Sequence, residues 1–214
     1  MQVFHRSANV LARASLIGAA LLVGFSLWLV YQLNRSPFAT EQRVQKAQPV
    51  PFSHEHHVSG LGIDCRYCHT TVETSSFAGI PPTATCMNCH RQIWTNAAML
   101  EPVRASFRSG EPLRWQRVNR LPEFVQFNHS IHIQKGIGCV SCHGRVDQMR
   151  LTWQDKPLTM AWCLSCHRAP EKHVRPRDKV FDLAWEPENQ AELGPRLVRE
   201  YGIQEKTACS YCHY

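Results

Sequence analysis

Cys65-Arg-Tyr-Cys68-His69 is one of five stretches in which two cysteines, three positions apart, are followed directly by histidine. The other four repeat this pattern and take up the rest of the chain's ten cysteines: Cys86-Met-Asn-Cys89-His90, Cys139-Val-Ser-Cys142-His143, Cys163-Leu-Ser-Cys166-His167 and Cys209-Ser-Tyr-Cys212-His213. Cys-x-x-Cys-His is the attachment motif of c-type haem. The two thiols add to the two vinyl groups of one haem, and the histidine becomes its proximal axial ligand. The sequence therefore predicts five covalently bound haem c groups.

Three other uses of paired cysteines fit this pattern less well. A disulfide framework does not need a histidine after each pair, and a zinc ribbon uses two pairs for each metal ion without that histidine. A thioredoxin-like motif occurs once, in a strand–helix–strand setting that this sequence lacks. Since all five pairs carry the histidine, we interpret them as haem-attachment motifs and number them one to five in chain order.

Composition narrows the class of protein further. Hydrophobic residues make up 43% of the 214-residue chain and charged residues 19%, which argues against both a disordered and a fully membrane-embedded protein. With 13 prolines and 11 glycines, a large self-sufficient hydrophobic core is not expected, so haem groups should fill the interior. The formal net charge of +7 falls to about +2 if each oxidised haem adds about −1. The positive residues are also scattered, so nucleic acid is excluded as a partner.

The N-terminal region predicts a membrane anchor. Residues 14–33 contain no charged side chain, and about 20 such residues are needed to cross the hydrocarbon core. Trp28 and Tyr31 lie near one end of this run, as interface anchors do. A cleaved signal peptide is the main alternative, but its apolar run is usually shorter, and a helix buried in a soluble core is also disfavoured. Because c-type haem is attached outside the cytoplasm, we expect a single-pass protein with its haem region on the extracytoplasmic face.

The haem region contains an internal repeat. Phe52-Ser-His54-Glu-His56-His57 leads into the first motif, and Phe127-Asn-His129-Ser-Ile-His132 leads into the third in the same way. A Pro/Thr segment then precedes the second and the fourth motif, so each repeat holds two haems and the fifth motif stands alone. Short helices are predicted at 91–100 and 189–203. The predicted fold is mainly α and irregular, with these parts: anchor 1–35, linker 36–51, first di-haem repeat 52–126, second di-haem repeat 127–188, and a C-terminal fifth-haem segment 189–214.

The distal axial ligands are predicted from the same repeat. Phe-x-His-x-x-His recurs intact, which selects His54, His57, His129 and His132. Two histidines three positions apart on a helical turn diverge enough to serve two neighbouring haems. Four distal histidines leave the fifth iron without one, and the remaining candidates are His56, His173, Met149 and Met160. His5 lies on the other side of the expected anchor.

Several segments resemble one family closely, the pentahaem cytochrome subunit of alternative complex III, a bacterial quinol:electron-acceptor oxidoreductase. The resemblance covers almost the whole chain and is carried by these segments: Phe52-Ser-His-Glu-His-His57, Gly62-Ile-Asp-Cys-Arg-Tyr-Cys-His69, Gly79-Ile-Pro-Pro-Thr83, Phe127-Asn-His-Ser-Ile-His132, Gly144-Arg-Val-Asp-Gln-Met149 and Leu158-Thr-Met-Ala-Trp-Cys163. In that family the position of His173, in Arg168-Ala-Pro-Glu-Lys-His, is variable. The resemblance therefore favours Met149 as the fifth distal ligand.

The resemblance also implies partners and a location. The expected partners are an iron–sulfur subunit of molybdopterin-enzyme type, polytopic quinol-binding membrane subunits and a mono-haem cytochrome c. The chain would lie in the bacterial cytoplasmic membrane, with its N-terminal helix in lipid and its haem region in the periplasm. Electrons from quinol would arrive through iron–sulfur clusters and leave through the haems.

Three functions compete at this point. The leading one is an electron wire without chemistry of its own, because all five motifs have the same proximal histidine and nothing indicates a substrate pocket. The second is a membrane-anchored multihaem quinol dehydrogenase, which would oxidise quinol directly and feed a periplasmic reductase. The third, a reductase of nitrogen or sulfur oxides, needs an open iron coordination position and is disfavoured because distal candidates outnumber the irons that need them.

Overall fold

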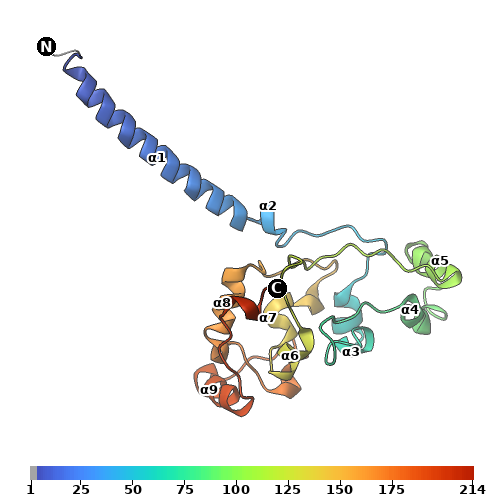
Figure 1. Cartoon of the computed structure of the whole chain (residues 1–214). Coiled ribbons are helices and arrows are strands. Elements are labelled where there is room, and N and C mark those ends of the chain that lie inside the picture. Colours follow the sequence, from blue (N-terminus) through green and yellow to red (C-terminus); the bar gives the residue numbers. More distant parts are fainter. Residues whose placement is uncertain (1–3) are drawn as a thin grey trace. The chain divides into compact units, whose positions relative to one another are not determined.

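The computed structural model describes residues 4–214 as two compact units, one ending at Gln42 and the other formed by Arg43–Tyr214 (Figure 1). Each unit is described by itself. The first contains the long N-terminal helix, and the second contains all five haem-attachment motifs. Residues 43–51, which the sequence analysis assigned to a linker, lie in the second unit: the Arg43 N–H donates to the Gln154 carbonyl at 2.8 Å, and Val50 is buried.

The N-terminal unit is dominated by helix α1, Ser7–Arg35, which has 29 residues and extends beyond the predicted span in both directions. Its apolar side chains are exposed along its length, as with Leu16 and Leu22. The helix ends at Arg35. The next residue, Ser36, has an extended backbone because proline follows, and Pro37 opens the short α2, Pro37–Thr40. Within residues 4–214, α1 is the one helix long and apolar enough to cross a membrane, a test that an anchor and a signal sequence both pass.

The second unit is built from short helical segments joined by irregular chain. The described residues form no named strand, and two isolated antiparallel bridges pair Val125 with His213 and Ile137 with Val174. The predicted mainly helical and irregular fold is therefore confirmed. The α-helices are α3 Cys65–Cys68, α4 Thr83–His90, α5 Glu101–Ser109, α6 His129–Gln134, α7 Cys139–His143, α8 Met160–His167 and α9 Gln190–Glu200. The other helical turns are η1 Glu55–Gly60, η2 Ala98–Leu100, η3 Val146–Gln148, η4 Pro170–Lys172, η5 Arg177–Lys179 and η6 Cys209–Tyr211.

Two small hydrophobic clusters hold this unit together. One packs α4 against α5, and its buried residues are Val50, Met87, Leu100 and Val103. The other packs α9 against η4, and its buried residues are Val174, Leu197 and Tyr201. Both clusters are far smaller than the core of an ordinary domain of this length, which agrees with a chain that wraps cofactors rather than its own side chains.

Of the two short helices predicted at 91–100 and 189–203, the structure contains one. The helix at 189–203 is confirmed as α9, which ends just before Gly202, a residue with a φ of +58°. The helix at 91–100 is wrong. Residues 91–97 form turns with Trp94 at a φ of +55°, and the α-helix begins only at Glu101, where Pro102 fits the first turn.

Candidate haem-binding sites

Each attachment motif lies on one short helical turn. A helical turn brings residues three apart onto the same face, so both thiols of a motif face the same way and the histidine follows at the end of the turn. Local caps set two of these turns in place: the Asp64 carboxylate accepts from the Arg66 N–H, and the Thr159 hydroxyl accepts from the Trp162 N–H. The structure joins none of the ten cysteines in a disulfide. Among the described residues no group of three or more His, Cys, Asp or Glu side chains gathers as in a metal site.

Three distal-candidate histidines face the histidine of an attachment motif. The ring centroids are 6.3 Å apart for His57 and His90, 6.4 Å for His129 and His143, and 6.1 Å for His132 and His167. A metal–imidazole bond is about 2 Å long, so two rings on opposite sides of one iron have centroids about 6 Å apart. The donor set therefore fits haem, whose porphyrin supplies the other four ligands.

The fourth candidate, His54, occupies the position in the first repeat that His129 has in the second. Burial lowers the pKa of His54 to about 4, and His69, the histidine of the first motif, adds the largest electrostatic contribution. By analogy with His129 and His143, His54 is the expected partner of His69. Both repeats then follow one rule: the first distal histidine faces the first motif of its repeat, and the second faces the second.

Hydrogen bonds at Nδ1 prepare these histidines to bind a metal through Nε2. An acceptor on Nδ1 fixes the tautomer and ring orientation and makes the other nitrogen a better ligand. The four distal candidates and the histidines of the first four motifs make eight histidines, and in six of them Nδ1 lies within hydrogen-bond distance of an oxygen. The acceptor is a backbone carbonyl for five of these: Ser53 for His57 at 2.8 Å, Asn128 for His132 at 2.7 Å, Ser76 for His129 at 2.8 Å, Gly79 for His69 at 2.7 Å and Ile93 for His90 at 3.2 Å. For His54 the partner is the Thr152 hydroxyl at 2.9 Å.

The phenylalanine of each repeat holds both distal rings at once. Phe52 stacks on His57 with centroids 4.4 Å apart and meets His54 edge-on at 4.9 Å. In the second repeat Phe127 stacks on His132 at 4.6 Å and meets His129 edge-on at 4.8 Å. The matching geometry explains why phenylalanine begins each Phe-x-His-x-x-His segment: one ring contacts and orients two imidazoles.

Burial keeps the candidate ligands in their neutral, metal-binding form. Desolvation is the largest cause of the lowered pKa at each shifted histidine of the two repeats. It lowers the pKa of His143 to about 4, and it also lowers the pKa values of His57 and His132. Neutral imidazole binds iron and imidazolium does not, so these rings are ready as ligands at neutral pH.

The fifth motif has a different environment from the other four. The ring of His213 lies 5.6 Å from that of Phe124, and its backbone pairs with Val125. Met149 is only 2% exposed, and its carbonyl accepts from the Glu55 N–H at 3.1 Å, beside the distal histidines of the first repeat. Its assignment to the fifth iron stays a prediction.

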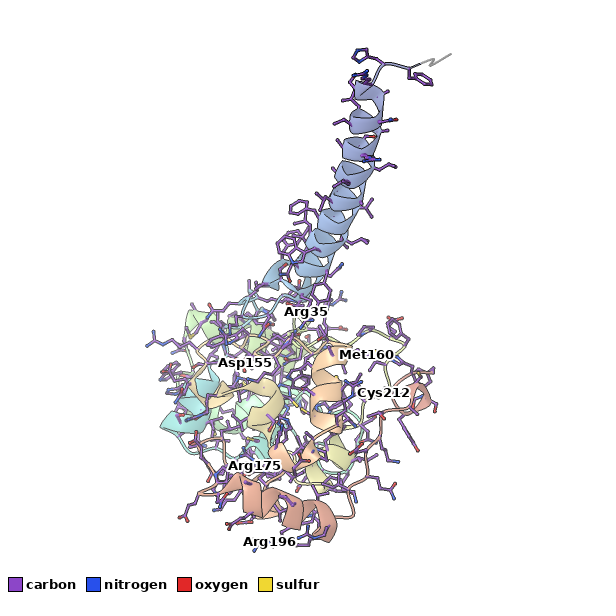
Figure 2. The ribbon with its side chains drawn as sticks, turned by 90° about the vertical axis from the view of Figure 1, so that its left-hand side faces the viewer. Arg35, Asp155, Met160, Arg175, Arg196 and Cys212 are labelled. Carbon is purple, nitrogen blue, oxygen red and sulfur yellow. The ribbon has the colours of Figure 1, made fainter. Side chains whose placement is uncertain are left out.

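The other candidates for the fifth iron lie in separate places. His56 stacks on Trp94 at 5.7 Å, and His173 lines a cavity of about 260 Å³ with Ser141 and Trp185. Met160 is exposed and is the first residue of α8. Figure 2 shows it beside the segment that carries Cys212.

Thr152 is a site residue that the sequence analysis missed. Its hydroxyl holds Nδ1 of His54, yet the two residues are 98 positions apart and nothing in the Leu-Thr-Trp context marks it. The loop acceptors Ser76 and Gly79 were also missed as ring partners, because backbone carbonyls leave no signal in the side-chain pattern.

Comparison with known proteins also connects this chain to c-type cytochromes. Residues 125–214, which carry the third, fourth and fifth motifs, match the family described as cytochrome c7 and related cytochrome c. Over 132 residues the chain is 38% identical to the menaquinone reductase multihaem cytochrome c subunit of Nitratidesulfovibrio vulgaris. That match covers 59% of this chain and 56% of the relative, so the chain spans just over half the length of the relative. The matched segment is cytochrome c7-like, and this family carries covalent haem c.

Proposed function

We propose that this chain is a five-haem electron wire in a membrane-bound, quinone-linked oxidoreductase. The observation that carries the proposal is the facing pairs of imidazoles, three of them with centroids 6.1–6.4 Å apart. Haem bound at these pairs supplies one-electron redox chemistry. Two histidines would hold each of these haems and leave no position for a substrate, so the residues present support electron transfer.

The protein contributes orientation and rigidity to that task. The Nδ1 acceptors and the two phenylalanines hold the imidazoles in place, so these side chains would keep one arrangement in both redox states of a bound haem. In this account residues of the two repeats would hold four haems as His54–His69, His57–His90, His129–His143 and His132–His167 pairs. His213 and, as proposed, Met149 would hold the fifth haem.

The surrounding complex is proposed on two grounds. The resemblance to alternative complex III implies an iron–sulfur subunit of molybdopterin-enzyme type, polytopic quinol-binding subunits and a mono-haem cytochrome c as partners. The named relative is a subunit of a menaquinone reductase, which also connects a multihaem chain of this kind to quinone chemistry. Helix α1 would anchor the chain in the bacterial cytoplasmic membrane with the haem unit in the periplasm.

Direction of electron flow separates two candidate functions. The resemblance favours quinol oxidation, with electrons leaving through the haems to a periplasmic acceptor. The name of the relative favours the reverse, in which a periplasmic donor feeds the haems and menaquinone is reduced. The same wire serves both directions, because the relative potentials of donor and acceptor decide which way electrons move.

Purification of the native complex tests the proposal. A tag before α1 leaves the fifth motif at the C-terminus untouched, and mass spectrometry of the purified complex identifies its subunits. In the intact complex, menaquinol should reduce the haems rapidly in a stopped-flow experiment, whereas the isolated chain should be reduced by dithionite only. Rapid quinol reduction of the isolated chain would instead support a multihaem quinol dehydrogenase. Menaquinone reduction driven by reduced periplasmic cytochrome, without the forward reaction, would select the reverse direction.

A further inference from the structure

We infer that the five attachment motifs are ordered in space as second, first, third, fourth and fifth, so that the second and fifth motifs form the two ends of the electron path. This inference rests on the proposed function and departs from the order along the chain, in which the first motif would be an end. It follows from contacts between motifs, from hydrogen bonds between the repeats and from the exposure of the thiols.

The central junction joins the first motif to the third. The side chains of Cys65 and Cys139 lie next to each other, although the two belong to different repeats. The histidines of these motifs, His69 and His143, also lie close together. Since the thiols mark the vinyl edge of each haem, the first and third haems should meet closely here.

Hydrogen bonds between the repeats stabilise the same junction. The loop after the first motif supplies the Ser76 carbonyl, which accepts from both the backbone N–H and Nδ1 of His129 at 3.2 and 2.8 Å. The neighbouring Ser75 carbonyl accepts from the Ser130 N–H at 3.1 Å. The distal histidine of the third haem is thus held by the chain that follows the first motif.

The second motif connects to the first. The side chains of Cys68 and Cys86 lie close together, and the Asn88 amide donates to the Tyr67 hydroxyl at 3.0 Å. Helix α4 also packs against α5 through the cluster around Met87 and Val103. The neighbours of the second motif are therefore the first motif and α5.

The fourth and fifth motifs continue the path beyond the third. His129 and His132, on the same helix α6, lie beside His143 and His167 of the third and fourth motifs, and Cys142 lies close to Cys163 and Cys166. Cys163 in turn lies close to Cys212 of the fifth motif. Figure 1 shows the same arrangement, with the dark red C-terminal segment lying beside α8.

Exposure of the thiols identifies the same two ends. Cys89 in the second motif and Cys209 in the fifth are exposed, while the other eight cysteines are partly buried. A haem at the end of a wire must approach a partner protein, whereas a haem in the middle must approach only other haems. The two motifs that the contacts place at the ends are thus the two most accessible to partners.

Redox titration of two distal-ligand variants of the full-length, detergent-purified holoprotein tests this order. His54→Met and His57→Met each replace one imidazole by a thioether, which raises the potential of the first or the second haem. That haem is then reduced early, and its added electron lowers the potentials of its nearest neighbours. In the proposed order the first haem has two neighbours and the second haem has one. We therefore expect His54→Met to lower the potentials of two other haems and His57→Met to lower the potential of one. The order along the chain predicts one for His54→Met and two for His57→Met, and that result would overturn the inference.

A milder variant serves if either methionine variant loses haem. Thr152→Val removes the hydroxyl that holds Nδ1 of His54, which makes that imidazole a weaker donor and raises the potential of the first haem without changing a ligand. Two other potentials should again fall, and a single falling potential would overturn the order. Thr74→Val, at an exposed turn threonine, is the matched control and should leave all five potentials unchanged. These equilibrium potentials are measured without quinol, so failure of the order is distinguishable from failure of the proposed function.

Discussion

Nδ1 of His129 lies 2.8 Å from the carbonyl oxygen of Ser76, a contact that spans 53 positions and joins the two repeats. A distal histidine of the second repeat is therefore oriented by a loop of the first. This loop follows the first motif and also contains Gly79, whose carbonyl accepts from Nδ1 of His69 at 2.7 Å. Residues 75–79 thus position two of the proposed axial ligands, one in each repeat, and the repeats should unfold together.

Gly79→Ala tests the importance of this loop. Gly79 has a φ of +84°, and an added Cβ would lie 2.8 Å from Oγ1 of Thr71. The left-handed backbone alone costs a non-glycine residue about 1–2 kcal/mol. In a domain of this size each kcal/mol of lost stability lowers the melting temperature by about 2–4 °C. We therefore expect the melting temperature, measured by circular dichroism, to fall by about 2–8 °C. Gly60→Ala, where the nearest atom lies at 3.7 Å and φ is not positive, should melt nearly like the parent.

Phe127→Leu tests the ring that orients two distal histidines. Leucine keeps an apolar side chain but loses the stacked contact with His132 and the edge contact with His129, and such aromatic pairs contribute about 0.5–1.5 kcal/mol each. Stability should fall by about 1–3 kcal/mol in chemical unfolding, and the electron paramagnetic resonance signals of two haems should broaden. Phe38→Leu, at a phenylalanine of the first unit that is 91% exposed, is the control. Equal effects of the two changes would show that Phe127 has no special part in orienting the ligands.

Near-infrared spectroscopy tests the fifth distal ligand. A histidine–methionine haem in the oxidised protein shows a weak sulfur-to-iron charge-transfer band, and the thioether makes this haem the highest in potential of the five. Met149→His should remove the band and lower one potential while the other four change little. Met160→His is the matched variant, since Met160 lies at the start of α8 beside the fifth motif. If the band survives the change at Met149 and disappears with the change at Met160, the ligand is Met160.

Protease accessibility tests the topology. Because α1 has 29 residues and is long and apolar enough to cross a membrane, we expect it to remain there as an anchor. A protease added to sealed vesicles should release the haem-bearing unit only from the periplasmic side. Release from the cytoplasmic side alone would contradict the proposed orientation, and a mature chain lacking α1 would identify a signal sequence.

The sequence revealed the attachment motifs and the candidate distal histidines more readily than the way they are joined. The Phe-x-His-x-x-His repeat pointed to His57, His129 and His132, and the structure places each of these rings opposite a motif histidine. Spacing alone carries this information, because residues three positions apart on a helical turn have a fixed position relative to each other. Ligation itself remains a proposal.

Contacts between distant segments left no such pattern. Thr152 holds His54 across 98 positions, and Cys65 meets Cys139 across two repeats, but neither pairing follows from a local period. The turn at 91–97 was also unpredictable, since Trp94 adopts a left-handed backbone that its residue type does not favour. These features depend on how the repeats dock, which the periodicity of either repeat alone does not determine.

Intact-mass spectrometry of the purified, denatured chain tests the central claim most directly, because covalent haem remains attached when the protein unfolds. A polypeptide whose five motifs all carry haem should exceed its sequence mass by five haem units. Changing Cys209 and Cys212 to serine should reduce this excess by one unit. A parent chain with fewer than five haem units after maturation by a complete cytochrome c assembly system would contradict the account, and a chain with none would remove its basis.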